Sequence, residues 1–335
     1  MKALVTGAAG HLGTALTELL VARGHQVRAA VRGSGDAVKS GPLKKLGVEV
    51  VEADILDAAA MERAAEGMDA LFHLAAVFRF VADDAEAIIR PAVQGAEHAL
   101  RAAKKAGIRR VVLTSSAVAI GTRALPDRPL DERDWNDAAT NAYGRAKTLA
   151  ERRAWQLAKE LGVDLVCINP TCLLGPGFTR HTPITYPIGQ WVFGEAPVTV
   201  PMGADYVDTR DVAAAHLAAF ETASASGRYL VSGVRKQAIE VARELRALRP
   251  QTKPARYELP KALLPVARAA DWLLSKTGKV PQQLSHDMLA DYLDDTVEYS
   301  SARAAAELGW RARPFAESLT DTADWILANR PAPYS

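Results

Sequence analysis

A phenol and an ammonium group stand four residues apart in the segment Tyr143-Gly144-Arg145-Ala146-Lys147. In a helix these two side chains lie on one face, about one turn apart. A tyrosine with its ordinary pKa of about 10 exchanges protons poorly near neutrality, and a nearby lysine cation favours the phenolate. Ser116, which follows an apolar run, offers a hydroxyl that can hydrogen-bond a developing oxyanion. Together the three residues predict proton transfer at a carbonyl oxygen, although a Tyr–Lys pair alone is common on amphipathic helices.

A glycine-rich segment near the N-terminus gives the second chemical signal, Thr6-Gly7-Ala8-Ala9-Gly10-His11-Leu12-Gly13. It follows a strand expected at 3–6 and opens a helix expected at 12–22. Glycines at this spacing let the backbone approach a pyrophosphate, and the helix N-terminus supplies free N–H groups. We predict a bound nicotinamide dinucleotide, the alternative being a plain strand-to-helix turn. The chemistry is then hydride transfer to a carbonyl carbon, with Tyr143 giving the proton and Lys147 also anchoring the nicotinamide ribose.

The end of the second expected strand bears on the choice of dinucleotide. NAD-binding proteins carry an acid there for the ribose 2′-hydroxyl, whereas this chain reads Arg28-Ala29-Ala30-Val31-Arg32-Gly33. Arg32 suits a 2′-phosphate, so NADP is the predicted cofactor and NAD is less favoured. Alternatively Arg32 is a solvated loop residue, and Asp36 reaches the ribose. Asp54, past the third strand, is predicted to bind the adenine amino group or, equally, to cap a helix.

Short apolar runs alternate with longer amphipathic segments, which predicts an α/β fold with a Rossmann doubly wound parallel sheet. Strands are expected at 3–6, 26–31, 48–52, 70–74, 110–114 and 164–168, and again at 227–232 after a helix at 211–221. Past Pro170, frequent prolines and aromatic residues indicate a smaller, irregular substrate lobe. We expect residues 1–172 and 203–233 to form the dinucleotide-binding domain, and residues 173–202 and 234–335 to form the substrate-binding lobe.

Composition narrows the class of protein. The net charge is 41 − 39 = +2 over 335 residues, so nucleic acid is not an expected partner. Two cysteines are too few for a disulfide framework, and the first residues enter a strand at once, so we expect a cytoplasmic monomer or homodimer. The longest stretch without charged residues, 165–179, is too short to span a membrane. His181 and His216 lack partners at metal-ligand spacing, so no metal site is predicted.

The sequence resembles the extended short-chain dehydrogenase/reductase family, part of the NAD-dependent epimerase/dehydratase superfamily. Besides the glycine loop, the resemblance rests on Leu74-Ala75-Ala76, Ser115-Ser116-Ala117, Tyr143-x-x-x-Lys147 and Asn169-Pro170. It is most similar to the branch of dihydroflavonol reductases, cinnamoyl-CoA reductases and microbial aldehyde or ketone reductases, through Arg90-Pro91-Ala92-Val93-Gln94-Gly95 and Leu174-Gly175-Pro176. The resemblance implies NADPH, with Ser116, Tyr143 and Lys147 as catalytic residues. It implies cofactor contacts at Gly7, Gly10, His11, Leu12, Gly13, Arg32, Asp54, Ile55, Leu74, Ala75, Ala76, Lys147 and Pro170.

Departures from the family's patterns limit the expected substrate. Flavonoid reductases commonly carry Asn or Asp where this chain has Gly121, and cinnamoyl-CoA reductases carry Asn-Trp-Tyr-Cys-Tyr where it has Asn141-Ala142-Tyr143-Gly144-Arg145. Neither plant activity is therefore expected. Nucleotide-sugar epimerases often place an arginine where Gly203-Ala204-Asp205 stands, which weakens the sugar hypothesis. The segment 72–80 nevertheless resembles bacterial proteins labelled hopanoid-associated sugar epimerases.

Apolar and aromatic residues suggest the substrate class. The candidates for substrate binding are Val77, Phe78, Phe80, Phe178, Tyr186 and Trp191. They predict an apolar, aromatic or alicyclic aldehyde or ketone, unless these aromatics only form the lobe's core. The leading hypothesis is an NADPH-dependent carbonyl reductase. The alternatives are an NAD(P)-dependent epimerase, dehydratase or hydroxysteroid-type dehydrogenase, and an NADP-sensing regulator without enzyme activity.

Overall fold

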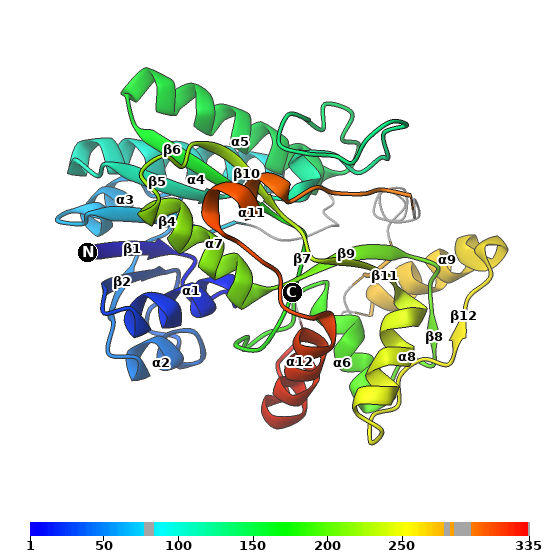
Figure 1. The fold of residues 1–335 in the computed structure, drawn as a ribbon. Helices are drawn as coiled ribbons and strands as arrows, with labels where there is room; N and C mark the ends of the chain where they lie inside the picture. Colours follow the sequence, from blue (N-terminus) through cyan, green and yellow to red (C-terminus); the bar gives the residue numbers. More distant parts are fainter. Residues whose placement is uncertain (77–83, 278–281, 285–295, 334–335) are drawn as a thin grey trace.

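A seven-stranded sheet forms the centre of the protein, whose computed structural model describes residues 1–76, 84–277, 282–284 and 296–333 (Figure 1). All neighbouring strands are parallel, in the order β10-β6-β5-β4-β1-β2-β3. The strands are β1 (Lys2–Thr6), β2 (Gln26–Val31), β3 (Glu49–Glu52), β4 (Ala70–His73), β5 (Arg110–Thr114), β6 (Asp164–Pro170) and β10 (Gly227–Val231). The direction of strand addition reverses between β1 and β4, which makes their carboxyl ends a topological switch point where ligands bind. The predicted α/β class with a Rossmann-type sheet is confirmed.

Helices cover both faces of this sheet (Figure 1). They are α1 (His11–Ala22), α2 (Ala37–Lys45), α3 (Ala58–Ala65), α4 (Glu86–Ala106), α5 (Ala142–Leu161) and α7 (Thr209–Glu221). Successive residues of a strand point to opposite faces. Val5 of β1 therefore joins the core beneath α1 and α7, whereas Leu4 joins the core beneath α3, α4 and α5. Both side chains are fully buried, which explains why the strands read as continuous apolar runs.

The smaller lobe contains strands that the sequence argument did not identify. β9 (Gly203–Asp208) pairs with β7 (Cys172–Leu174) in parallel and with β11 (Val234–Gln237) antiparallel, and β8 (Val198–Thr199) pairs with β12 (Tyr257–Glu258). β9 thus belongs to the lobe's sheet while β10 joins the main sheet, and the predicted division into two domains stays a prediction. The other elements are α6 (Thr185–Phe193), α8 (Ala238–Leu248), α9 (Leu264–Ser275), α11 (Ala302–Leu308) and α12 (Phe315–Asn329), with short 3-10 turns η1 (Ala117–Ala119) and η2 (Lys261–Leu263). Over the described ranges, no helix has the length and apolar character needed to cross a bilayer.

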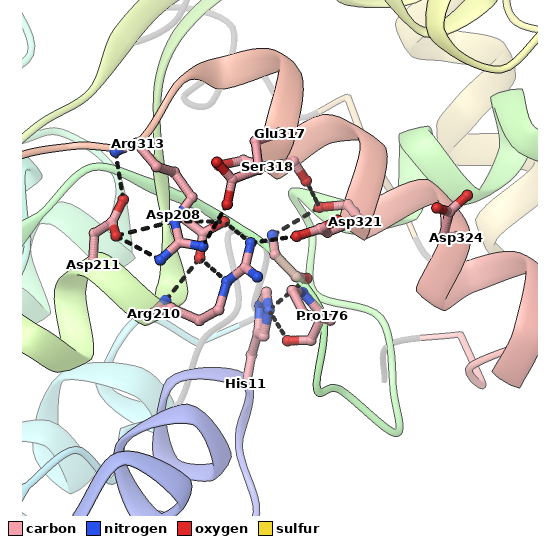
Figure 2. Close-up of polar contacts among 12 residues, drawn as sticks. His11, Pro176, Asp208, Arg210, Asp211, Arg313, Glu317, Ser318, Asp321 and Asp324 are labelled. Atoms are coloured by element: carbon pink, nitrogen blue, oxygen red, sulfur yellow. Dashed lines mark hydrogen bonds and ion pairs between the residues drawn. The ribbon is translucent and has the colours of Figure 1, made fainter.

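Ion pairs fasten the last helix of the lobe to the main domain (Figure 2). The buried carboxylate of Asp208 accepts the backbone N–H of Arg210 at 2.9 Å and so caps α7. The Arg210 guanidinium bridges this carboxylate, at 2.8 Å, to Asp321 of α12, at 2.7 Å. Arg313, just before α12, pairs with Asp211 of α7 at 2.9 Å. The position of α12 is therefore set by the first turn of α7.

Candidate active site

The glycine loop lies between the ends of β1 and β4, and two of its glycines allow no side chain. Gly7 has a φ of +68°, and a Cβ there would lie 2.8 Å from the backbone nitrogen of Ala75. A Cβ on Gly13 would lie 2.1 Å from the Gly7 carbonyl oxygen. The Thr6 hydroxyl accepts the backbone N–H groups of Leu74 at 3.2 Å and Ala75 at 3.3 Å, which joins the two strand ends. This close packing leaves the N-terminus of α1 open to a pyrophosphate, so the loop fits a dinucleotide.

The glycine loop and the catalytic candidates line one cleft. Its walls include eleven of the predicted site residues: Gly7, Gly10, His11, Leu12, Gly13, Leu74, Ala76, Ser116, Tyr143, Lys147 and Pro170. Ala75 lies directly behind Gly7. The structure therefore brings the predicted cofactor residues and the predicted proton donor to the same space.

The start of α5 positions the predicted catalytic residues. The Asn141 side chain caps the helix by accepting the Gly144 N–H at 2.6 Å. In the helix that follows, Tyr143 and Lys147 are one turn apart, and the Lys147 ammonium donates to the carbonyl oxygen of Thr114 at 3.3 Å. The hydroxyl of Ser116, beyond β5, hydrogen-bonds the Tyr143 phenol. The three side chains thus meet at the carboxyl ends of β5 and β6.

Burial changes the acid–base properties of these groups. Burial raises the pKa of the Tyr143 phenol well above its ordinary value, and the hydrogen bond from Ser116 opposes this rise. Burial also lowers the pKa of Lys147 to about 8, against the attraction of the Glu151 carboxylate. The sequence argument expected the lysine cation to favour the phenolate, whereas here the burial of the phenol has the larger effect. The phenol of Tyr143 is protonated at neutral pH even at its ordinary pKa, and burial favours the same neutral form, which can donate a proton.

A buried ion pair beneath these residues escaped the sequence argument. The Glu151 carboxylate, one turn beyond Lys147 on α5, accepts the Arg228 Nε–H at 2.6 Å and the Asn169 amide at 2.9 Å. The exposed fractions of the Glu151 and Arg228 side chains are 0% and 7%. The Arg228 guanidinium also stacks 3.9 Å from the centre of the Trp135 ring. The four-residue spacing of Tyr143, Lys147 and Glu151 could have indicated that Glu151 lies on the same face of the helix. No local motif marks Arg228, which lies on β10.

The three predicted substrate residues that the structure describes, Phe178, Tyr186 and Trp191, are not among the residues that line the cleft. Phe178 and Trp191 lie in the core of the small lobe, and the Phe178 ring packs 4.9 Å from the His11 ring. Tyr186 is buried against His181, with ring centres 5.8 Å apart. Val77, Phe78 and Phe80 lie outside the described residues. The role of these six in substrate binding stays a prediction, and the placement of Phe178 and Trp191 favours the alternative that aromatics form the lobe's core.

Other residues also line the cleft, and the sequence argument missed them because they come from many separate segments. They are Thr122, Cys172, Leu173, Thr182, Ile184, Gly203, Ala204, Asp205, Arg235, Val297 and Tyr299. Most of these side chains are apolar or uncharged. The exception is an ion pair between Arg235 and Asp205, which joins β11 to β9 at 2.7 Å.

Three predicted cofactor residues lie at the ends of β2 and β3, away from the walls of this cleft. Arg32 is exposed in the loop after β2. The Asp54 carboxylate accepts the backbone N–H of Leu56 at 2.9 Å in the turn before α3, whereas Asp57 caps that helix, so Asp54 is not the helix cap that was the alternative to adenine binding. The carbonyl oxygen of Ile55 hydrogen-bonds the His98 ring at 2.8 Å. In this fold the same strand ends meet the adenosine half of a dinucleotide.

The dinucleotide loop facing a buried Ser–Tyr–Lys set defines a nicotinamide-dependent oxidoreductase. Residues 3–232 match the NAD dependent epimerase/dehydratase family, and the chain belongs to this family. Cinnamoyl-CoA reductase 1 of Arabidopsis thaliana is 37% identical over 269 residues, which cover 76% of each chain.

Solved structures share the fold over nearly the whole chain. The structure of gox2253 has a TM-score of 0.81 at 28% identity and covers 98% of this chain and 99% of that chain. Yeast methylglyoxal/isovaleraldehyde reductase Gre2, complexed with NADPH, has a TM-score of 0.77 at 22% identity, with the same coverage of 98% and 99%. Together with the family match and the 37% identity to cinnamoyl-CoA reductase 1, these findings confirm the predicted extended short-chain reductase branch, and the protein is an NAD(P)-dependent oxidoreductase.

Proposed function

We propose that the protein reduces the carbonyl group of an apolar, aromatic or alicyclic aldehyde or ketone with NADPH. One observation carries this proposal: Tyr143, Lys147 and Ser116 line the same cleft as the glycine loop. The walls of that cleft also include Leu173 and Ile184, which suit an apolar carbonyl compound. Similarity to cinnamoyl-CoA reductase supports carbonyl reduction as the reaction class.

Each catalytic residue of the cleft has a separate role in the proposed reaction. The dinucleotide, when bound, supplies the hydride that forms the new C–H bond. Tyr143, whose phenol carries its proton at neutral pH, donates that proton to the carbonyl oxygen as negative charge develops there. Ser116 hydrogen-bonds the same oxygen. Lys147 stabilises the phenolate that remains and binds the nicotinamide ribose.

We also propose NADP(H) over NAD(H), and a cytoplasmic monomer or homodimer. Arg32 favours a 2′-phosphate, and the similar Gre2 structure contains NADPH. The small number of cysteines in the chain supports a reducing compartment.

One observation favours an epimerase or dehydratase as the second candidate. The sequence argument counted the lack of an arginine before Tyr206 against a sugar-nucleotide substrate. The structure places the guanidinium of Arg235 beside Asp205, at the neighbouring position on β11. A cation that can meet a diphosphate is therefore present on the cleft wall.

Nicotinamide absorbance tests the proposal. Purified protein is assayed with NADPH and with NADH against aromatic, alicyclic and aliphatic aldehydes and ketones, with Tyr143→Phe as the control. NADPH oxidation that is lost in the variant supports the reductase. Tightly co-purified cofactor without net NADPH consumption supports the epimerase. If the protein binds the cofactor but turns over none of these aldehydes and ketones and catalyses no epimerisation or dehydration, the result supports the NADP-sensing regulator.

A further inference from the structure

The loop after β2 presents two backbone N–H groups to a single carboxylate. The Gly33 N–H donates to one oxygen of Glu52 at 2.7 Å, and the Ser34 N–H donates to the other oxygen. These hydrogen bonds hold the pKa of Glu52 at about 2, well below its ordinary value. Converging backbone N–H groups of this kind form an anion-binding concavity. The loop is therefore a preformed anion site, and the chain's own Glu52 fills it.

The position of Glu52 in the sheet places its carboxylate near the expected binding site of the cofactor ribose. In the ladder between β2 and β3, Glu52 is the direct partner of Val31, the last residue of β2. The end of β2 is where Rossmann folds place the acid that binds the ribose 2′-hydroxyl of NAD. This chain has no acid on β2 there, but the neighbouring strand supplies one at the same level.

We propose that Glu52 is a specificity-determining residue for the cofactor, which favours NAD and opposes the preference of Arg32 for NADP. A carboxylate can accept a hydrogen bond from the 2′-hydroxyl of NAD. A 2′-phosphate, with a charge of about −1.5 to −2, is repelled by the carboxylate and needs the same two N–H groups. This inference rests on the dinucleotide site of the proposed function.

The charged side chains around the loop favour neither NAD nor NADP by a large margin. The Lys39 ammonium would lie 3.8 Å from a Cβ on Gly33, so a second cation is at hand for a phosphate. Lys39 is already paired with Asp36 at 3.6 Å, however, and the Asp36 carboxylate caps α2 through the Val38 N–H at 2.9 Å. The loop region thus carries two cations, Arg32 and Lys39, and two carboxylates, Asp36 and Glu52. Removing one carboxylate should shift the balance measurably toward NADP.

Cofactor binding without substrate tests the inference. The full-length protein is titrated with NADPH and with NADH, and nicotinamide fluorescence gives the two Kd values. Glu52→Gln is expected to tighten NADPH binding about tenfold, from loss of like-charge repulsion, and to leave NADH binding unchanged or weaker. Glu49→Gln is the matched control, because Glu49 lies on the same strand and pairs with Arg28 at 2.8 Å, outside the loop. It is expected to leave the ratio of the two Kd values unchanged.

The outcomes separate this inference from the proposed function. An unchanged Kd ratio in Glu52→Gln overturns the inference, as does an equal weakening of both cofactors, which would mean that Glu52 only holds the loop in shape. Arg32→Ala provides a second variant, expected to weaken NADPH binding selectively; an equal effect on both cofactors also contradicts the competition. Failure of the unaltered protein to bind either dinucleotide overturns the proposed function and the inference together.

Discussion

Glu151→Gln should be strongly destabilising, although the substitution keeps the size and shape of the side chain. It removes the charge that the buried Arg228 guanidinium faces at 2.6 Å. Breaking a buried ion pair from one side costs about 3–5 kcal/mol, because the remaining charge is left uncompensated in the interior. The loss should fall toward the lower end of that range, since Arg228 keeps its hydrogen bonds to the carbonyl oxygens of Glu132 and Asp134 and its contact with Trp135.

The same change should alter the pH dependence of turnover. The Glu151 carboxylate raises the pKa of Lys147, which stands at about 8. Without the carboxylate the pKa of Lys147 falls, so the lysine loses its proton at a lower pH than in the unaltered protein. We expect the alkaline limb of the kcat profile to move down by about one pH unit or more. A purely structural role for Glu151 would lower stability without moving this limb.

Chemical denaturation and a pH–rate profile together form the assay. Glu160→Gln is the control, because Glu160 lies on the same helix but is 50% exposed and pairs with Arg153 at 3.8 Å; such a pair is worth about 0–1 kcal/mol. In the double variant Glu151→Gln/Arg228→Met, most of the lost stability should return, since no charge is left buried. A loss below about 1 kcal/mol in the single variant, or strictly additive losses in the double variant, would refute the reasoning.

Three further predictions follow from the site and the core. Tyr143→Phe should lower kcat about 10²–10⁴-fold with the Kd of NADPH unchanged; turnover that survives in this variant would show that another group donates the proton. Gly13→Ala should abolish dinucleotide binding, because its Cβ would lie 2.1 Å from the Gly7 carbonyl oxygen; Gly41→Ala, with no atom within 4 Å of the added Cβ, is the control for calorimetric titration. Acid should unfold the protein early: burial lowers the pKa of His73 to about 3 and of His216 to about 4. Because the unfolded chain binds these protons from pH 6.5 downward, stability should fall from there to about pH 4 by about 1.4 kcal/mol per pH unit for each histidine, and His216→Gln should flatten the slope seen by denaturation at several pH values.

Local signals made part of the molecule predictable. The strand at 110–114 begins and ends where the sequence argument placed it, because its buried apolar run, residues 111–113, has a polar residue on either side. The glycine loop and the Tyr143–Lys147 pair were equally readable, since helix geometry alone fixes how these side chains relate.

The rest depends on contacts between distant segments. β7 and β8, with three and two residues, are too short to show a periodic pattern. An aromatic residue such as Trp191 buries the same apolar surface in a core as in a pocket, so its residue type cannot separate the two roles. Glu52 and Arg228 act through partners on other strands, and only the strand order brings those partners together.

The Arg228–Glu151 pair also sets an order of events for a chain leaving the ribosome. The residues of the glycine loop and of α5 are synthesised first, and 77 positions separate Glu151 from its guanidinium partner. Most of the small lobe's first excursion is made in between. Until β10 has emerged and paired with β6, the helix that carries Tyr143 and Lys147 rests on a carboxylate without this counter-ion. The buried ion pair beneath the catalytic centre is therefore incomplete until that edge strand has been synthesised and has paired with β6.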